Sequence, residues 1–317
     1  MAAIITIIAV IAVLYLLLTW GMFQLICRRF SGKFNPLAII GETTNEALKP
    51  YEDQVNAGIR WTREHPSEEV EITSFDGLKL KGTYFHNPDA RAIMIGCHGY
   101  RGNGPRDFSS ACNFYHNHGM SLLLIDQRAN GRSEGKYITF GIREHRDIRD
   151  WCFYIQERFP HIPILLVGIS MGATGVLMAA PEVPENVKCL VADCGFVSPW
   201  DELGYVLRHY LHIPGTPFLC GINLWCRLLG GFGLREFSTE KALAQNTRPV
   251  FFIHGEADDF VPCKNAARNV AVCTAPHVLF TVPEAGHGMS YLVDYDGYVE
   301  KFYEFLDMCG FPRNDIE

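Results

Sequence analysis

The stretch ILLVGISMGATGVLMAA at residues 164–180 says most about how this chain folds. An apolar run suited to a buried strand leads into Gly168-x-Ser170-x-Gly172, and a segment that favours a helix follows directly. A strand, a sharp GxSxG turn and a helix together form a nucleophile elbow, which lifts the serine hydroxyl above the sheet. The glycines leave room for the tight turn, and the helix N-terminus favours negative charge beside the hydroxyl. Ser170 is therefore the predicted nucleophile.

The segments around this elbow predict an α/β fold with a mostly parallel central sheet and helices on both faces. Near-continuous apolar runs suit strands buried on both faces of a parallel sheet, and they alternate with helix-length segments. The runs are AIMIGCHG, SLLLIDQR, ILLVGIS, VKCLVAD and VFFIHGEAD; the helical segments include 105–118, 142–159 and 171–180. Ahead of them, EEVEITSFDGLKLKGTYFHN alternates around Asp76-Gly77, which predicts an N-terminal antiparallel hairpin.

A serine nucleophile needs a base, and the base needs a carboxylate to orient it. His287 lies between glycines after the last apolar run, HVLFTV, and is the predicted base. Asp258 lies at the carboxyl end of the preceding run, VFFI, and is the preferred acid. Asp193, which ends VKCLVAD, is its main competitor, and Asp259 is a weaker one. The chain order Ser170, Asp258, His287 is the order used by α/β-hydrolases.

Two backbone N–H groups are the predicted oxyanion hole, which stabilises charge on a tetrahedral intermediate. One belongs to Met171, directly after the nucleophile, and the other to Tyr100 in the loop CHGYRG. His98 in that loop is predicted to shape it rather than to carry protons. The loop DQRANGRSEG is predicted to form a polar scaffold beside the site; its residues of interest are Asp126, Arg128 and Ser133.

Residues 2–26 carry no charge and are almost uniformly apolar. About 20 such residues span a bilayer as a helix, and the segment lacks the basic start and small-x-small site of a cleaved signal peptide. The sequence therefore predicts a single-pass membrane protein with a transmembrane helix at residues 1–27. Arg28, Arg29 and Lys33 follow this helix, so the positive-inside rule favours the cytoplasmic face for the rest of the chain, with the external face left open.

Over fifty residues separate the runs that end at Asp193 and begin at Val250, and their core is rich in apolar, Gly and aromatic residues. A surface loop is rarely so apolar. The predicted insertion, about 197–247, is a helical lid over a hydrophobic acyl-binding pocket; extra helices on the sheet edge are the alternative. The remaining predicted divisions are a connector at 28–66 and a catalytic domain at 67–317.

The amino-acid composition excludes several other classes of protein and of binding site. The 317 residues carry a net charge of −7, without the basic footprint of a nucleic-acid binder. The eleven cysteines form no CxxC pair, which favours reduced, buried thiols over disulfides. No metal is predicted, because the His and Cys residues lack the clustering of zinc ligands. No cofactor is predicted either, since no usable nucleotide-binding motif occurs.

Taken together, HGYRGN, DQRANGRSEG, GISMG, ADCGFVSP, HGEADDFVP and AGHG resemble the α/β-hydrolase superfamily over roughly residues 60–310. More narrowly, the chain resembles membrane-anchored bacterial hydrolases described as similar to serine aminopeptidases. The resemblance implies the same triad, Ser170, Asp258 and His287, and the same oxyanion donors, Tyr100 and Met171. One departure is that Ala129 and Asn130 replace the Gly and His usual in the DxRGHGxS loop of relatives.

These observations predict a serine hydrolase that cleaves a carboxylic ester or related acyl bond of a small, hydrophobic acyl substrate through an acyl-enzyme. Three alternatives stay open, because the fold hosts many chemistries. A serine aminopeptidase or amidase would need an acidic group for the substrate ammonium, for which the insertion offers Asp201, Glu202 and Glu236. An acyltransferase shares every motif, and a non-catalytic interaction protein would keep the scaffold alone.

Overall fold

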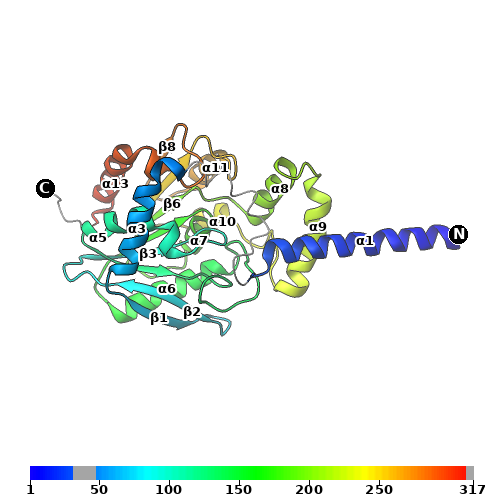
Figure 1. Cartoon of the computed structure of the whole chain (residues 1–317), viewed down its shortest axis with the longest axis horizontal. Helices are drawn as coiled ribbons and strands as arrows, with labels where there is room; N and C mark the ends of the chain where they lie inside the picture. The colour runs from blue at the N-terminus through cyan, green and yellow to red at the C-terminus, as the bar shows by residue number, and fades with distance from the viewer. Residues whose placement is uncertain (31–47, 312–317) are drawn as a thin grey trace.

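The computed structural model describes residues 1–30 and 48–311. Within them the chain forms an eight-stranded sheet with the order β1-β2-β4-β3-β5-β6-β7-β8 (Figure 1). The strands are β1 (Glu68–Thr73), β2 (Lys79–Phe85), β3 (Ala92–Cys97), β4 (Met120–Ile125), β5 (Ile164–Ile169), β6 (Val187–Asp193), β7 (Val250–Gly255) and β8 (His277–Val282). β2 runs antiparallel to β1 and β4, and every other neighbouring pair is parallel. The predicted mostly parallel sheet with an antiparallel N-terminal hairpin is therefore confirmed.

The hairpin turns at Asp76 and Gly77, as the alternating pattern predicts. Gly77 has φ of +88°, a backbone conformation that residues other than glycine adopt only at a cost in free energy. Its N–H donates to the Ser74 carbonyl, and the Ser74 N–H donates to the Leu78 carbonyl. The hairpin is thus closed by its own backbone, and it adds two strands to one edge of the parallel sheet.

Helices cover both faces of the sheet, which explains why the central strands are apolar throughout. One face packs against α6 (Glu144–Arg158), α7 (Met171–Ala179), α10 (Thr239–Leu243) and α11 (Lys264–Val272). The other packs against α3 (Glu52–Glu64), α5 (Ser109–Asn117), α12 (Ser290–Val293) and α13 (Tyr295–Cys309). Every residue of β3, β4 and β7 is buried. Burial of one large apolar side chain stabilises the fold by about 1.5–3 kcal/mol.

The predicted insertion is helical, and its parts have different neighbours. It contains α8 (Pro199–His209), α9 (Gly215–Trp225), the π-helical turn η3 (Cys226–Gly230) and α10. A third apolar cluster joins α8, α9 and η3 to the N-terminal helix and to Met171. In contrast, α10 packs against α7 and α11 in the body of the molecule. The part of the insertion that leaves the body is therefore α8 to η3.

The N-terminal helix α1 (Ala2–Cys27) projects from the body beside α9 (Figure 1). Among the described residues it is the one helix that is long and apolar enough to cross a membrane. Little of its most apolar stretch is buried, unlike the core helix of a soluble protein. Length, apolar composition and exposure fit a membrane anchor. The anchor and its orientation stay predictions.

The predicted connector at 28–66 is described only in part, because residues 31–47 and, with them, Lys33 lie outside the described residues. Its second half contains the turn η2 (Lys49–Tyr51) and α3, and α3 packs against α5. Each of the eleven cysteines, all within the described residues, is free.

Candidate active site

Ser170 occupies the sharp turn between β5 and α7. Its backbone has φ of +56° and ψ of −119°, a strained conformation for a residue with a side chain. Both flanking glycines are required sterically: a Cβ on Gly168 would lie 2.5 Å from the Ala173 nitrogen, and one on Gly172 would lie 2.0 Å from the Cys97 carbonyl oxygen. The turn is therefore held by close backbone packing on both sides of the serine.

The structure brings Ser170, His287 and Asp258 into one hydrogen-bonded row. His287 Nε2 lies 2.9 Å from Ser170 Oγ, and its Nδ1 lies 2.8 Å from Asp258 Oδ2. The three residues follow β5, β7 and β8, which pack in parallel and end at the same edge of the sheet. This geometry leaves Nε2 free to accept the serine proton while Nδ1–H donates to the carboxylate.

Asp258, rather than Asp259, faces the histidine. Its Oδ1 accepts the N–H groups of Phe260 and Val261 at 3.0 and 2.8 Å, and His254 Nε2 lies 3.4 Å from Oδ2. Burial opposes ionisation of this carboxyl, but the His287 charge and these hydrogen bonds outweigh burial and lower its pKa to about 2. Asp258 is thus a fixed negative charge at neutral pH, whereas Asp259 is exposed.

The same pair of groups sets the charge state of His287. Burial would lower the pKa of the imidazole, but the charge and hydrogen bond of Asp258 raise that pKa above its ordinary value. The Phe260 ring packs edge-on against the imidazole, with ring centroids 5.1 Å apart. The histidine is therefore stabilised in the protonated form that a general base passes through.

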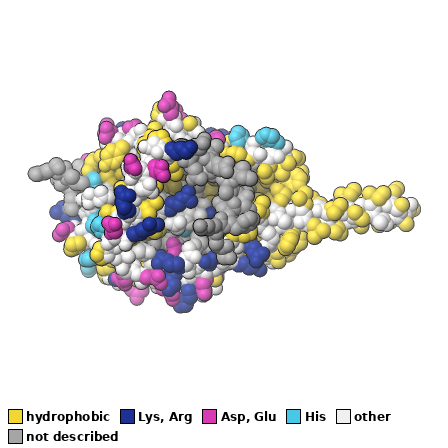
Figure 2. Space-filling model, in the orientation of Figure 1, with side chains coloured by type: hydrophobic (Ala, Val, Ile, Leu, Met, Phe, Trp, Pro, Cys, Tyr) yellow, Lys and Arg dark blue, Asp and Glu magenta, His cyan; other side chains and the backbone are white. Residues whose placement is uncertain are grey.

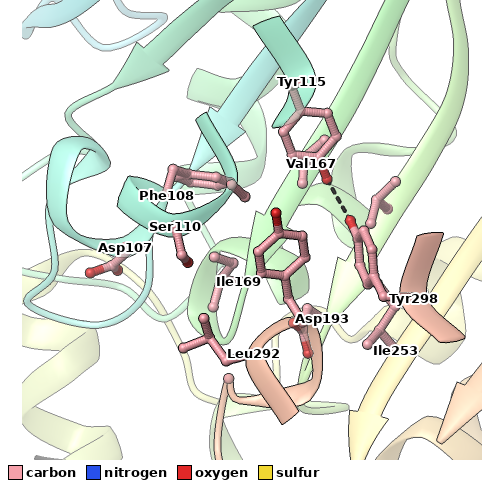
Figure 3. A pocket seen from close by; sticks show the side chains of 14 residues that line it. Asp107, Phe108, Ser110, Tyr115, Val167, Ile169, Asp193, Ile253, Leu292 and Tyr298 are labelled. Carbon is pink, nitrogen blue, oxygen red and sulfur yellow. Dashed lines mark hydrogen bonds between the residues drawn. The ribbon is translucent and has the colours of Figure 1, made fainter. Parts of the chain in front are cut away.

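Asp193 lies close to the row without joining its hydrogen bonds. Its carbonyl accepts the Ser170 N–H at 2.8 Å, but its Oδ1 has no hydrogen-bond partner among the described residues. Burial raises the pKa of this carboxyl to about 6. It lines a cavity of about 40 Å³ beside Tyr115 and Tyr298, whose hydroxyls are hydrogen-bonded at 2.7 Å (Figure 3). That volume suits a few water molecules and is too small for an acyl chain.

The two predicted oxyanion donors lie in the segments that border Ser170. Met171 is the first residue of α7, where helix N–H groups have no acceptor within the helix. Gly99 borders the serine so closely that a Cβ there would lie 3.4 Å from Ser170 Cβ, and its N–H donates to Asp107 Oδ2. Tyr100 follows in the same loop, so both predicted donors belong to segments that border Ser170.

His98 holds this loop in place through hydrogen bonds to backbone groups. Its Nδ1 lies 2.7 Å from the Gly99 carbonyl, and its Nε2 accepts the Gln127 N–H at 3.1 Å. The Gln127 side-chain amide in turn donates to the His98 carbonyl. Both ring nitrogens are thus used for backbone contacts, as expected of a residue that shapes the loop.

The end of α1 also holds this loop, a contact that sequence reasoning missed. Tyr100 Oη donates to the Ile26 carbonyl at 2.6 Å. Arg101, which has φ of +54°, donates to the carbonyls of Leu25 and Arg28 at 2.9 and 3.0 Å. The last four carbonyls of a helix have no donor within the helix and need one from elsewhere in the chain. This rule could have indicated that the end of α1 binds side-chain donors such as Tyr100 and Arg101.

The three acidic residues considered for an ammonium-binding pocket have different surroundings. Asp201 pairs with Arg268 at 3.1 Å, and Glu236 accepts the Gly233 N–H at 2.8 Å. Glu202 is buried, its Oε1 has no partner among the described residues, and burial raises the pKa of its carboxyl well above the usual value. Burial therefore favours the neutral form of this carboxyl, and a cation that approached it would favour the charged form.

One group of possible metal ligands overlaps the row. Among the described residues, Cys194, Asp258 and His287 present ligand atoms within 4.8 Å of one another. Both imidazole nitrogens already face Asp258 and Ser170. Burial and the nearby Asp193 and Asp258 raise the pKa of the Cys194 thiol well above its usual value, which disfavours the thiolate that metals bind. The hydrogen-bonded row is the better explanation of this cluster.

The loop after β4 ties the hairpin to α6. Arg128 is buried and pairs with Asp147 of α6 and, at 2.9 Å, with Asp76 at the hairpin turn. Ser133 Oγ donates to the Asp126 carbonyl and accepts the Lys81 N–H. These contacts are those of a polar scaffold that joins the hairpin to α6, and the position of this loop beside the site stays a prediction.

Known proteins resemble this chain in sequence and in structure. Residues 92–216 match the family model described as alpha/beta hydrolase fold. YqkD of Bacillus subtilis is 28% identical over 247 residues, which cover 76% of this chain and 81% of that protein. Protein bem46 of Schizosaccharomyces pombe is 22% identical over 261 residues, covering 78% of each chain.

A solved structure of the Pyrococcus furiosus esterase Pf2001 superposes with a TM-score of 0.62 at 24% identity, covering 77% of this chain and 91% of that one. At this identity the likeness concerns the fold alone. The sheet order, the strained serine between β5 and α7 and the family match lead to one assignment. This chain has the α/β-hydrolase fold.

Proposed function

We propose that this chain is a membrane-anchored serine hydrolase that cleaves a carboxylic ester through an acyl-enzyme. The observation that carries the proposal is the row from Ser170 Oγ through His287 to Asp258, with contacts of 2.9 and 2.8 Å. The strained elbow that presents the serine supports it.

In the proposed reaction, Ser170 Oγ attacks the carbonyl carbon while His287 Nε2 takes its proton. The Met171 and Tyr100 N–H groups stabilise the oxyanion; one such donor is worth about 10²–10³ in kcat. The C–O bond to the alcohol breaks, and the alcohol leaves with the proton from His287. Water, deprotonated by His287, then attacks the acyl-enzyme and releases the acid. Asp258 stabilises the protonated imidazole in both halves of the reaction.

A hydrophobic acyl group is the proposed substrate feature. The apolar cluster of the insertion reaches Met171, next to the nucleophile, and also contains Val261 near the triad. The Pyrococcus furiosus relative of known structure carries the name esterase, which favours ester chemistry. A series of p-nitrophenyl esters of increasing chain length tests this feature. Activity confined to the acetyl and propionyl esters would overturn the hydrophobic part of the proposal.

The proposed anchor is α1, retained in the mature chain with the hydrolase on the cytoplasmic side. Arg28 and Arg29 follow it directly, and the positive-inside rule favours the cytoplasmic face for such a basic flank. Its last carbonyls hold Tyr100 and Arg101, so removing α1 as a signal sequence would strip the proposed oxyanion loop of these partners.

An aminopeptidase or amidase is the second candidate, and Glu202 is the residue that favours it. A buried carboxyl whose Oε1 has no partner among the described residues can hold a substrate ammonium once it ionises. Turnover of aminoacyl arylamides, abolished by Glu202→Gln and without turnover of simple esters, would replace the ester proposal. An acyltransferase shares the first half-reaction and differs only in the acceptor of the acyl group.

The deciding experiment treats membranes containing the full chain with a fluorescent fluorophosphonate and compares wild type with Ser170→Ala. We expect labelling of the wild type and none of the variant. Ser198→Ala, a change at the N-terminal cap of α8, is the matched control and is expected to label normally. Absence of labelling in folded wild type would favour the non-catalytic interpretation.

A further inference from the structure

Among the described residues, the first half of α1 is the part of this helix that is exposed along its whole length. Residues 2–14 are exposed throughout. In the second half, Tyr15, Thr19, Phe23 and Cys27 follow one another at intervals of four, so they share one face of the helix. This face contacts α9 and, through Cys27 and Cys226, η3 of the insertion. Thr19, Phe23 and Cys27 are fully buried.

The contact between α1 and the insertion is close and specific. Tyr15 Oη donates to the Pro217 carbonyl at 2.6 Å, and Trp225 Nε1 donates to Thr19 Oγ1 at 3.2 Å. At Gly221 the two helices approach so closely that a Cβ would lie 2.4 Å from Thr19 Cγ2. Figure 1 shows α9 crossing α1 where α1 leaves the body. The second half of α1 and the insertion therefore form one packed unit.

The length of the free half limits where this unit can lie. At 1.5 Å per residue, residues 2–14 measure about 20 Å. The hydrocarbon core of a bilayer is about 30 Å thick. The free half cannot cross it alone, and a tilt would shorten its span further. If α1 spans the bilayer, roughly 10 Å of the packed unit must lie in the hydrocarbon as well.

The surface of the packed unit suits that position. Leu211, Leu224, Leu228 and Leu229 of the insertion are exposed, Leu228 to 65%. No Asp or Glu occurs between Leu211 and Leu234, and Arg227 is the one Lys or Arg there. The face of α1 that turns away from α9 is also apolar and exposed; it carries Leu17, Leu18, Trp20 and Leu25. Figure 2 shows hydrophobic side chains gathered at the end of the molecule from which α1 projects.

We infer that α9 and η3 insert into the bilayer beside α1, and that the partner of this surface is the hydrocarbon of the membrane. The inference rests on the proposed anchor and deepens the proposed function. The inserted unit directly contacts the loop of Tyr100 and Arg101 beside Ser170. The substrate class that follows is an ester dissolved in the bilayer, which reaches the site without crossing water.

Bromolipid quenching tests the depth of the insertion in the full chain. The accessible cysteines are first replaced (Cys220→Ser, Cys263→Ser, Cys309→Ser), and one NBD-labelled cysteine is then introduced at a time. The probe variants are Val10→Cys in free α1, Leu229→Cys in η3 and Met308→Cys in α13. Leu229 and Met308 are matched, since both are apolar and their exposures are 45% and 43%. The proteins are placed in phosphatidylcholine–phosphatidylglycerol vesicles with or without brominated acyl chains.

We expect the bromolipids to remove roughly half or more of the fluorescence at positions 10 and 229, and little at position 308. Quenching at 10 without quenching at 229 would overturn the inference and keep the anchor. A blue-shifted but unquenched probe at 229 would also overturn it, in favour of a second copy covering the surface. No quenching at position 10, or equal quenching at position 308, would overturn the inference together with the proposed anchor on which it rests. Fluorophosphonate labelling of the same samples reports separately on the proposed hydrolase activity.

Discussion

Two buried aspartates lie at the carboxyl ends of strands near Ser170, Asp193 as the last residue of β6 and Asp258 in the turn after β7, and their surroundings shift their pKa values in opposite directions. Asp258 receives two backbone N–H groups and faces His287, so its pKa falls to about 2. Asp193 has no partner for Oδ1 among the described residues, and burial raises its pKa to about 6. Both aspartates end an apolar run, so the pattern alone favoured one without excluding the other. The difference comes from the charge of His287, which faces Asp258, and from the hydrogen-bond donors around Asp258, which include the turn after β7.

The proposed role of His287 predicts the acid side of the pH profile. A protonated imidazole cannot accept the Ser170 proton, so activity is lost as the pH falls through the pKa of His287. Because Asp258 raises that pKa, we expect kcat/KM for a soluble ester to decline with an apparent pKa above the ordinary value of about 6.5. With Asp258→Asn, the apparent pKa should fall and kcat should drop by about 10⁴. Steady-state kinetics between roughly pH 5 and pH 9, a range that covers histidine titration, measure the apparent pKa and kcat of both proteins.

Asp193→Asn is the matched control for this prediction. It removes a carboxyl next to the same serine but leaves the hydrogen bond from Asp258 to His287 in place. We expect kcat within about tenfold of wild type, since a displaced neighbour costs far less than the wrong histidine tautomer. A larger loss with Asp193→Asn than with Asp258→Asn would reverse the assignment of the acid.

At the level of elements, the hairpin is joined to the parallel sheet by charge as well as by strand pairing. Arg128 connects α6 to the hairpin turn through Asp147 and Asp76, and the Arg128 and Asp147 side chains are 4% and 2% exposed. A buried pair adds little net stability, but breaking it leaves an uncompensated charge. The ion pair is therefore a constraint on where the hairpin docks.

Arg128→Met is expected to destabilise the fold by about 3–5 kcal/mol, because it strands the buried Asp147 carboxylate. The melting temperature in mild detergent should fall by roughly 10 °C. Arg268→Met removes an arginine that is 42% exposed and pairs with Asp201 and Glu240 at the surface, so its cost should stay below about 1 kcal/mol. Equal decreases in melting temperature for the two variants would show that the buried Arg128 pair matters no more to stability than the exposed Arg268 pair.

At the scale of the whole molecule, the N-terminal helix is packed against the body instead of being a simple tether. The apolar cluster that contains Phe23 and Cys27 also contains Phe232 and Met171. Tyr100 is held between the α1 carbonyls and the Phe140 ring, with ring centroids 5.3 Å apart. The condition of the proposed oxyanion loop therefore depends on a segment more than seventy residues away along the chain.

Two deletions separate anchoring from packing. A chain lacking residues 2–14 keeps the packed half of α1, so we expect it to leave the membrane fraction more readily and to label with fluorophosphonate within about twofold of wild type. A chain lacking residues 2–27 exposes the apolar face of α9 and frees Tyr100. We expect it to label at least about tenfold more slowly, the cost of a misplaced oxyanion donor. Equal labelling by both chains in detergent, with both folded by circular dichroism, would contradict a role of α1 beyond anchoring.

The sequence by itself determined the sheet and the elbow. Continuous apolar runs are stable only as strands covered on both faces, and GxSxG after such a run can turn only where no side chain blocks the backbone. It also predicted Ser170, His287 and Asp258, which the structure brings together. The tertiary structure alone decided that α1 packs on α9, that Arg101 binds its carbonyls and that Glu202 is buried, with no partner for its Oε1 among the described residues. Local patterns report on periodicity and turns, whereas these contacts join residues far apart in the chain, and only the folded packing brings them within reach.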